Sequence, residues 1–251
     1  MAGTVELTRM GGKVALVELD NPPMNAMNTE SCSKMLEVFG ALQDDYEIRA
    51  IVFTGRGRAF CSGADLKEAR QGATEGVSAF GEVLERVAAS RAPVIAAVNG
   101  HCIGGGLELA LCCDLRIAST DARFVCAGVN VGLMASTYRL PRLIGISRAK
   151  AMLLTGSPFD ASVVEAWGLV TALHAPKQLS DAAIALAERI ASRAPLSIEA
   201  TKRFADRAVD VSPAEAREML VRELSVLQAS RDHLEAISAF AEKREPVFSR
   251  S

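Results

Sequence analysis

Residues 93–109 read PVIAAVNGHCIGGGLEL. The run from Val94 to Val98 is short and continuously apolar, which is typical of a strand buried on both faces of a parallel sheet. Three glycines at 104–106 then lead into a helix-like stretch from Leu107 to Cys112. Glycine lets a backbone approach a ligand closely, and the start of a helix offers unpaired N–H donors at its positive end. The segment therefore predicts a strand–loop–helix unit that could bind a phosphate or stabilise an oxyanion.

Glu108 stands one turn into this helix, next to an apolar stretch. A carboxylate in such surroundings is a natural candidate for a general base. Two simpler interpretations stay open beside it. The helix dipole alone favours a glutamate at this position, and the glycines could serve only to relieve crowding in a tight turn.

A second loop of the same kind reads SGADLK at residues 62–67 and follows another apolar run, Ile48–Thr54. Two such loops after two apolar strands could direct two backbone N–H groups at one carbonyl oxygen. Taken alone, Asp65 could be a simple helix N-cap and Lys67 a solvated cation.

The remaining pattern alternates strands and helices up to about Ser147 and is mostly helical afterwards. Further strands are expected at Lys13–Leu19, Leu115–Ala118 and Leu169–Leu173, and helices at Asn28–Asp45 and Val77–Ser90. Apolar stripes at helical spacing continue through the C-terminal part, with a helix start at Ser212. We therefore expect an α/β protein with a helical C-terminal region.

The composition excludes several classes of protein. The 251 residues are 49% hydrophobic and 23% charged with a net charge of -2, so we expect no nucleic-acid partner. No apolar run approaches the ~20 residues of a membrane span, and the N-terminus has no apolar signal-peptide core. We expect a cytoplasmic protein with no membrane partner. The six cysteines form no CxxC and the three histidines are scattered, which predicts free thiols and no metal site.

These motifs, taken in order, resemble the crotonase (enoyl-CoA hydratase/isomerase) superfamily. The matching segments cover nearly the whole chain: NP at 21–22, NAM at 25–27, IVFTG at 51–55, AFCSGADLK at 59–67, PVIAAVNG at 93–100, GGGLELA at 104–110, CD at 113–114, LTG at 154–156, AWGLV at 166–170 and AFAEKR at 239–244. Each segment is weakly specific by itself. Their shared order makes a chance resemblance untenable.

The resemblance implies a spiral of ββα turns followed by helices that drive trimerisation. On this basis we expect a crotonase-like α/β core over residues 1–195 and a helical C-terminal region over residues 196–251. It also implies a homotrimer or a dimer of trimers. The substrate would be an acyl-CoA thioester, with CoA present only as part of the substrate and no further cofactor.

The resemblance also assigns roles to residues. The backbone N–H groups of Ala64 and Gly105 would form an oxyanion hole, and Glu108 would be the acid/base group. Contacts to CoA and substrate are implied for a set of residues in both loops, in the NAM segment and near the C-terminus: Ala26, Ser62, Ala64, Asp65, Leu66, Lys67, Gly105 and Lys243. Lys243 could act on the CoA phosphates of a neighbouring subunit.

One part of the family pattern is missing. Hydratases of the family use a second glutamate, and its position is Gly128 here, with the following stretch, 133–138, about three residues shorter. Because general acid–base help contributes ~10²–10⁴-fold, this loss could cost roughly 3–5 kcal/mol of barrier unless water or Asn130 substitutes. We expect a hydratase or dehydratase that relies on Glu108. The alternatives are an isomerase, a thioester hydrolase or a non-catalytic acyl-CoA-binding paralogue.

Overall fold

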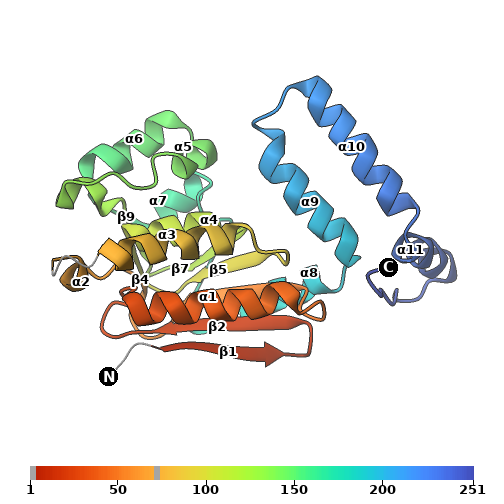
Figure 1. Ribbon diagram of the computed structural model, residues 1–251, viewed down its shortest axis with the longest axis horizontal. Helices are drawn as coiled ribbons and strands as arrows, with labels where there is room; N and C mark the ends of the chain where they lie inside the picture. Colours follow the sequence, from red (N-terminus) through yellow and green to blue (C-terminus); the bar gives the residue numbers. More distant parts are fainter. Residues whose placement is uncertain (1–3, 71–73) are drawn as a thin grey trace.

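The computed structural model describes residues 4–70 and 74–251, and its strands form two sheets (Figure 1). The six-stranded sheet has the order β1-β2-β3-β5-β7-β10, and the four-stranded sheet has the order β4-β6-β8-β9. The strands of the larger sheet are β1 (Thr4–Met10), β2 (Val14–Asp20), β3 (Ala50–Gly55), β5 (Val94–Val98), β7 (Leu115–Ser119) and β10 (Ala172–His174). Those of the smaller sheet are β4 (Ala59–Cys61), β6 (His101–Ile103), β8 (Arg123–Val125) and β9 (Pro158–Asp160).

The larger sheet is parallel except for the β1–β2 hairpin at its edge. All five residues of β5 are buried, and this strand lies between β3 and β7. Its continuous apolar sequence therefore follows from coverage of both faces, as predicted.

Each of three central strands is followed by a short strand of the second sheet, so β3 leads to β4, β5 to β6 and β7 to β8. Helices come after the first two of these pairs: α2 (Leu66–Arg70) and α3 (Thr74–Ala88), then α4 (Gly105–Cys112). This repetition confirms the predicted α/β class and its ββα turns. It also brings the loops after β4 and β6 to the same edge, because these two strands are parallel neighbours.

Helices cover both faces of the larger sheet. On one face α1 (Thr29–Asp44) packs against α3 and contributes Met35 and Phe39 to the main core. On the other face α8 (Leu179–Ala191) lays a row of alanines against β2, β3, β5 and β7. Asn28 caps α1, since its side-chain oxygen accepts a hydrogen bond from the Ser31 N–H at 2.8 Å.

The structure differs from the sequence expectations mainly in its short strands. None of the four strands of the smaller sheet was expected, because three residues are too few to show a period. Strand β1 was also missed, since most of its side chains are exposed at the sheet edge. The strand expected at Leu169–Leu173 is wrong in its first half, because β10 begins only at Ala172.

The C-terminal helices extend away from the two sheets (Figure 1). They are α9 (Pro195–Ala208), α10 (Pro213–Gln228) and α11 (Arg231–Glu242). Three further helices lie between β8 and β10 in the sequence: α5 (Arg139–Ile144), α6 (Ile146–Thr155) and α7 (Ala161–Ala166). Ser212 and Glu215 form a capping box at the start of α10. Within residues 4–70 and 74–251, no helix combines the length and the apolarity that a membrane crossing requires.

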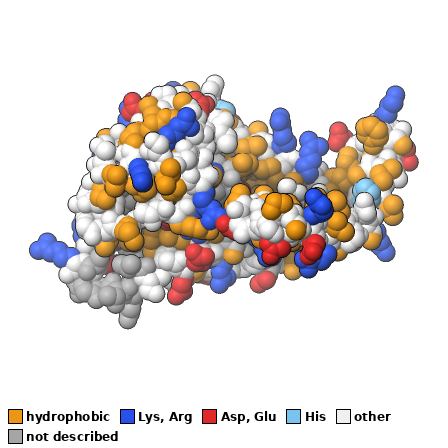
Figure 2. All heavy atoms as spheres, turned by 90° about the horizontal axis from the view of Figure 1, so that it is seen from above, with side chains coloured by type: hydrophobic (Ala, Val, Ile, Leu, Met, Phe, Trp, Pro, Cys, Tyr) orange, Lys and Arg blue, Asp and Glu red, His pale blue; other side chains and the backbone are white. Residues whose placement is uncertain are grey.

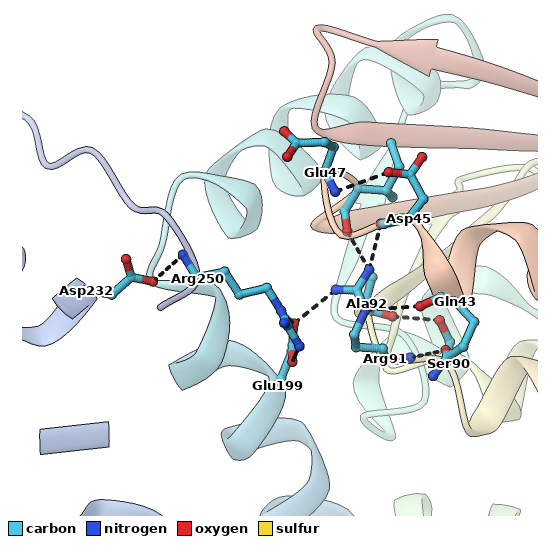
Figure 3. Close-up of polar contacts among 10 residues, drawn as sticks. Gln43, Asp45, Glu47, Ser90, Arg91, Ala92, Glu199, Asp232 and Arg250 are labelled. Atoms are coloured by element: carbon cyan, nitrogen blue, oxygen red, sulfur yellow. Dashed lines mark hydrogen bonds and ion pairs between the residues drawn. The ribbon is translucent and has the colours of Figure 1, made fainter. Parts of the chain in front are cut away.

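A buried carboxylate on α9 ties these helices to the body of the protein (Figure 3). Glu199 accepts hydrogen bonds from Arg91 at 3.0 Å and from two nitrogens of Arg250, each at 2.9 Å. Arg91 also donates to the backbone carbonyls of Asp45 and Ile48, at 2.8 and 3.1 Å. One glutamate therefore joins α9, the C-terminal segment and the connections that flank α1 and β5.

We expect Glu199→Ala to lower the free energy of unfolding by about 3–5 kcal/mol, because it leaves the Arg91 guanidinium buried without its partner. Chemical denaturation at pH 7 measures this loss. Glu223→Ala is the matched control, since Glu223 forms a more exposed ion pair with Arg203 and its loss should cause no measurable change. Equal stability of both variants would contradict the role of Glu199.

The same carboxylate makes a defined contribution to the pH dependence of stability. Burial raises the pKa of Glu199, but the guanidiniums of Arg250 and Arg91 outweigh it and hold this pKa below its usual 4.5. The stabilisation is therefore complete above pH 4.5 and is lost as the pH falls through the lower pKa of the folded state. The acid limb of the stability curve should be shallower in Glu199→Ala than in the wild type.

Candidate active site

Two glycine-containing loops meet at the edge where β4 and β6 end. A Cβ atom on Gly63 would lie 2.6 Å from the Gly105 nitrogen, and one on Gly106 would lie 2.0 Å from the Cys61 carbonyl oxygen. Gly63 also has a φ of +87°, in the region that favours glycine. The loops can therefore approach this closely only because side chains are absent at both positions.

The backbone N–H groups of Ala64 and Gly105 are the predicted oxyanion donors. Ala64 forms a parallel bridge with Met27, in which the Met27 N–H donates to Gly63 at 2.8 Å and the Asp65 N–H donates to Met27 at 2.9 Å. Gly105 is the first residue of α4, so its N–H has no acceptor within the helix. In the part of the chain that the structure describes, neither N–H has a protein acceptor. Both donors are free on adjacent loops.

Glu108 lies in the first turn of α4, three residues after Gly105. Helical side chains lean toward the N-terminus, so its carboxylate covers the same end of the helix as the free N–H groups. Its Oε1 accepts a hydrogen bond from Arg139 at 3.0 Å, whereas its Oε2 is buried and has no partner among the described residues. Glu108 is thus held at one oxygen by Arg139, while its other oxygen is buried without a hydrogen-bond partner among the described residues.

The structure shows why position 128, where the family resemblance led us to expect a second acid, holds a glycine. Gly128 lies in a 3-10 helix (Ala127–Val131), and a Cβ atom there would be 2.9 Å from the Leu133 oxygen and 3.0 Å from the Ala135 nitrogen. The shortened stretch therefore packs its own backbone where a second carboxylate side chain would begin. The Asn130 side chain donates to the Gly156 carbonyl at 2.9 Å, so its amide is engaged at the end of α6.

The predicted CoA contacts near the glycine loops lie close together in the structure. Ala26 precedes Met27, whose bridge to Ala64 holds the NAM segment beside residues 62–65. Leu66 and Lys67 are exposed at the start of α2. Asp65 accepts a hydrogen bond from the Lys67 N–H at 2.7 Å, so the simple capping interpretation of its side chain is also correct.

Lys243 is the predicted site residue that does not join this group within one chain. It is exposed and ends α11, which lies at the opposite end of the molecule from α2 (Figure 1).

Two residues that make polar contacts in this region, Asn25 and Arg139, were not singled out as site residues by sequence analysis. Asn25 has a φ of +53°, and its buried amide donates to the carbonyls of Arg56 and Ala59 at 2.9 and 2.6 Å. The motif NAM was a usable signal for Asn25. No local signal existed for Arg139, whose partner is 31 residues away in sequence.

The thiols of this region are unsuited to nucleophilic chemistry. All six cysteines are free and buried, as predicted. Burial raises the pKa of both Cys61 and Cys126 to about 12. A protonated thiol is a poor nucleophile, so these side chains act as packing groups.

Comparison with known proteins gives a consistent result. The family model described as enoyl-CoA hydratase/isomerase matches residues 9–251. The (E)-benzylidenesuccinyl-CoA hydratase of Thauera aromatica is 40% identical over 245 residues, which cover 94% of this chain and 95% of that protein. The short-chain-enoyl-CoA hydratase of Clostridium acetobutylicum is 34% identical over 93% of each chain. The crystal structure of an enoyl-CoA hydratase from Bacillus anthracis superposes with a TM-score of 0.95 at 30% identity and covers 98% of this chain and 99% of its own.

We expect Gly128→Ala to lower the free energy of unfolding by about 1–3 kcal/mol, because the added methyl group displaces the backbone at Leu133 and Ala135. Chemical denaturation measures the change. Gly81→Ala is the matched control: it lies within α3, its Cβ would meet nothing within 4 Å, and alanine should preserve or raise stability. Gly128→Glu suffers the same crowding, so it should destabilise the loop rather than restore a working second carboxylate. An unchanged free energy of unfolding in Gly128→Ala would contradict this explanation, because the backbone at Leu133 and Ala135 would then move aside at no cost.

Proposed function

The chain belongs to the enoyl-CoA hydratase/isomerase family, and from this premise we propose that it adds water across the Cα=Cβ bond of an enoyl-CoA thioester, or removes it in reverse. The observation that supports the proposal is the contact of the two glycine loops at the start of α4, where the N–H groups of Ala64 and Gly105 have no protein acceptor among the described residues and the first helical turn carries Glu108. These are the groups that the reaction needs: donors for a thioester oxygen and a carboxylate for proton transfer.

The N–H groups of Ala64 and Gly105 would donate to the thioester oxygen. When water attacks Cβ, negative charge moves to that oxygen and an enolate forms. Donors fixed by the loop contact need no reorganisation as this charge develops, and each is typically worth ~10²–10³ in rate.

Glu108 would take a proton from the attacking water through Oε2 and return it to Cα of the enolate. Both transfers fall on Glu108, because Gly128 offers no carboxylate and backbone fills the space around it. Proton transfer of this kind contributes ~10²–10⁴-fold. The chemistry requires no metal, flavin or nicotinamide, and CoA takes part only within the substrate.

The CoA moiety would lie along Ala26 and residues 62–67, with Lys67 available to its phosphates. Lys243 would reach this site from a neighbouring subunit. The candidate acyl groups are short chains and the benzylidenesuccinyl group, which appear in the names of the two relatives. We place the protein in the cytoplasm, where a reducing environment suits six free thiols.

We also propose that the chain forms a homotrimer or a dimer of trimers through its C-terminal helices. Apolar side chains are exposed on this protruding part, which is seen at the right of Figure 2. On α10 they are Leu220, Val221 and Leu224; on α11 they are Leu234, Ile237 and Phe240, the last being 88% exposed. Several large apolar side chains exposed on one part of a molecule are typical of a protein interface.

We expect Glu108→Gln to lower kcat by roughly 10²–10⁴ while acyl-CoA affinity stays nearly constant, because glutamine keeps the shape but cannot accept the proton. Steady-state hydration of crotonyl-CoA and (E)-benzylidenesuccinyl-CoA measures the rate, and calorimetry the affinity. Glu85→Gln is the matched control, since Glu85 also contacts Arg139 but is 78% exposed. A Glu108→Gln rate within threefold of wild type would remove Glu108 from the mechanism. Binding without turnover of any thioester by the wild type would favour the acyl-CoA-binding paralogue.

Multi-angle light scattering at micromolar concentration should give three or six times the mass of one chain. Replacing Leu224 and Phe240 together by aspartate should reduce this mass, because both charges would be buried at the interface. A monomeric wild type would contradict the assembly.

A further inference from the structure

Arg139 forms a shielded contact with the proposed base. Its Nη1 donates to Glu108 Oε1 at 3.0 Å and its Nη2 to Glu85 Oε1 at 3.4 Å. The side chains of Arg139 and Glu108 are 22% and 13% exposed, whereas that of Glu85 is 78% exposed. Charge pairs are screened less when water is excluded, so the contact with Glu108 is the stronger of the two.

The position of Arg139 is not explained by the helix that carries it. Arg139 is the first residue of α5, where the helix dipole disfavours a cation. Leu140 and Ile144 are buried in the core and hold α5 in place. An unfavourable cation at the start of a helix that is held in place by its core residues indicates that the side chain serves a contact outside the helix. The shielded contact of Arg139 is the one with Glu108.

We propose that Arg139 is a positioning residue that holds Glu108 Oε1 so that Oε2 remains directed to the reacting water. This inference rests on the proposed function, in which Glu108 performs both proton transfers. A single carboxylate must take the proton from the water and then deliver it to Cα. Its orientation therefore matters more than it would with a second acid present. Among the described residues Oε2 has no hydrogen-bond partner, so no protein group competes with the water for this oxygen once substrate is bound.

The loop that fills the second acid position also delivers Arg139. Leu133 and Ala135 pack against Gly128, and the chain then enters α5 through Ser136, which has a φ of +60° and is buried. A non-glycine residue rarely adopts this conformation, so the path from the loop to Arg139 is tightly constrained. The same short connection thus crowds position 128 and sets the place of Arg139, the partner of Glu108.

The test compares Arg139→Gln, Arg139→Lys, Glu108→Gln and the double variant Glu108→Gln/Arg139→Gln on the thioester that the wild type hydrates fastest. We expect Arg139→Gln to lower kcat roughly 10- to 100-fold, because a misplaced base loses near-attack geometry, with KM within threefold. Arg139→Lys should recover part of the loss, because lysine keeps the charge without the planar fork. The double variant should be no slower than Glu108→Gln alone. Arg142→Gln, one turn further on α5 and paired with Asp210, is the matched control and should stay within twofold.

Each other outcome has a defined meaning. If the losses from Glu108→Gln and Arg139→Gln multiply in the double variant, Arg139 acts independently of Glu108 and the inference is overturned. It is also overturned if Arg139→Gln changes KM as much as kcat, or leaves kcat within threefold. If Arg139→Gln does not fold, Arg139→Lys in the wild-type and Glu108→Gln backgrounds decides by the same criterion. If Glu108→Gln itself is fully active, the proposed function fails first and the inference falls with it.

Discussion

The backbone contact between the loops after β4 and β6 is the constraint on which the site depends. Gly63 approaches Gly105, and Gly106 approaches the Cys61 carbonyl, at separations that exclude a side chain at positions 63 and 106. Because β4 and β6 are parallel neighbours, this contact sets the start of α4 against residues 62–65. This arrangement brings the backbone N–H groups of Ala64 and Gly105, which have no protein acceptor among the described residues, onto loops in direct contact. A side chain at position 63 or 106 would therefore force the two loops apart.

The sequence was informative where its signals were local. The strand Val94–Val98, the glycine turn and the helix that follows could be placed from apolar runs and glycine chemistry within a few residues. The smaller sheet could not, because its three-residue strands are defined by pairing partners far away in sequence. Arg139 was missed for the same reason: nothing around it indicates a contact with Glu108.

The glycine at position 128 and the path of residues 133–135 depend on each other. Viewed along the sequence, Gly128 looks like a lost catalytic group and the stretch after it like an unrelated deletion. In the structure, the backbone at Leu133 and Ala135 occupies the space beside Gly128, so a side chain at this position and the short loop are incompatible. The segment that crowds position 128 continues into α5, whose first residue, Arg139, donates a hydrogen bond to Glu108.

The six buried cysteines give the molecule a built-in reporter of its own motions. Burial raises the pKa of Cys61 and Cys112 to about 12, so near neutral pH almost no thiolate is available to a labelling reagent while the core stays closed. Modification then has to wait for a segment to open, and its rate measures how often that segment does so. Cys32 is a buried residue of α1, Cys61 and Cys102 lie in the small sheet, and Cys126 precedes the 3-10 helix. The order in which they react would therefore rank these regions by local stability.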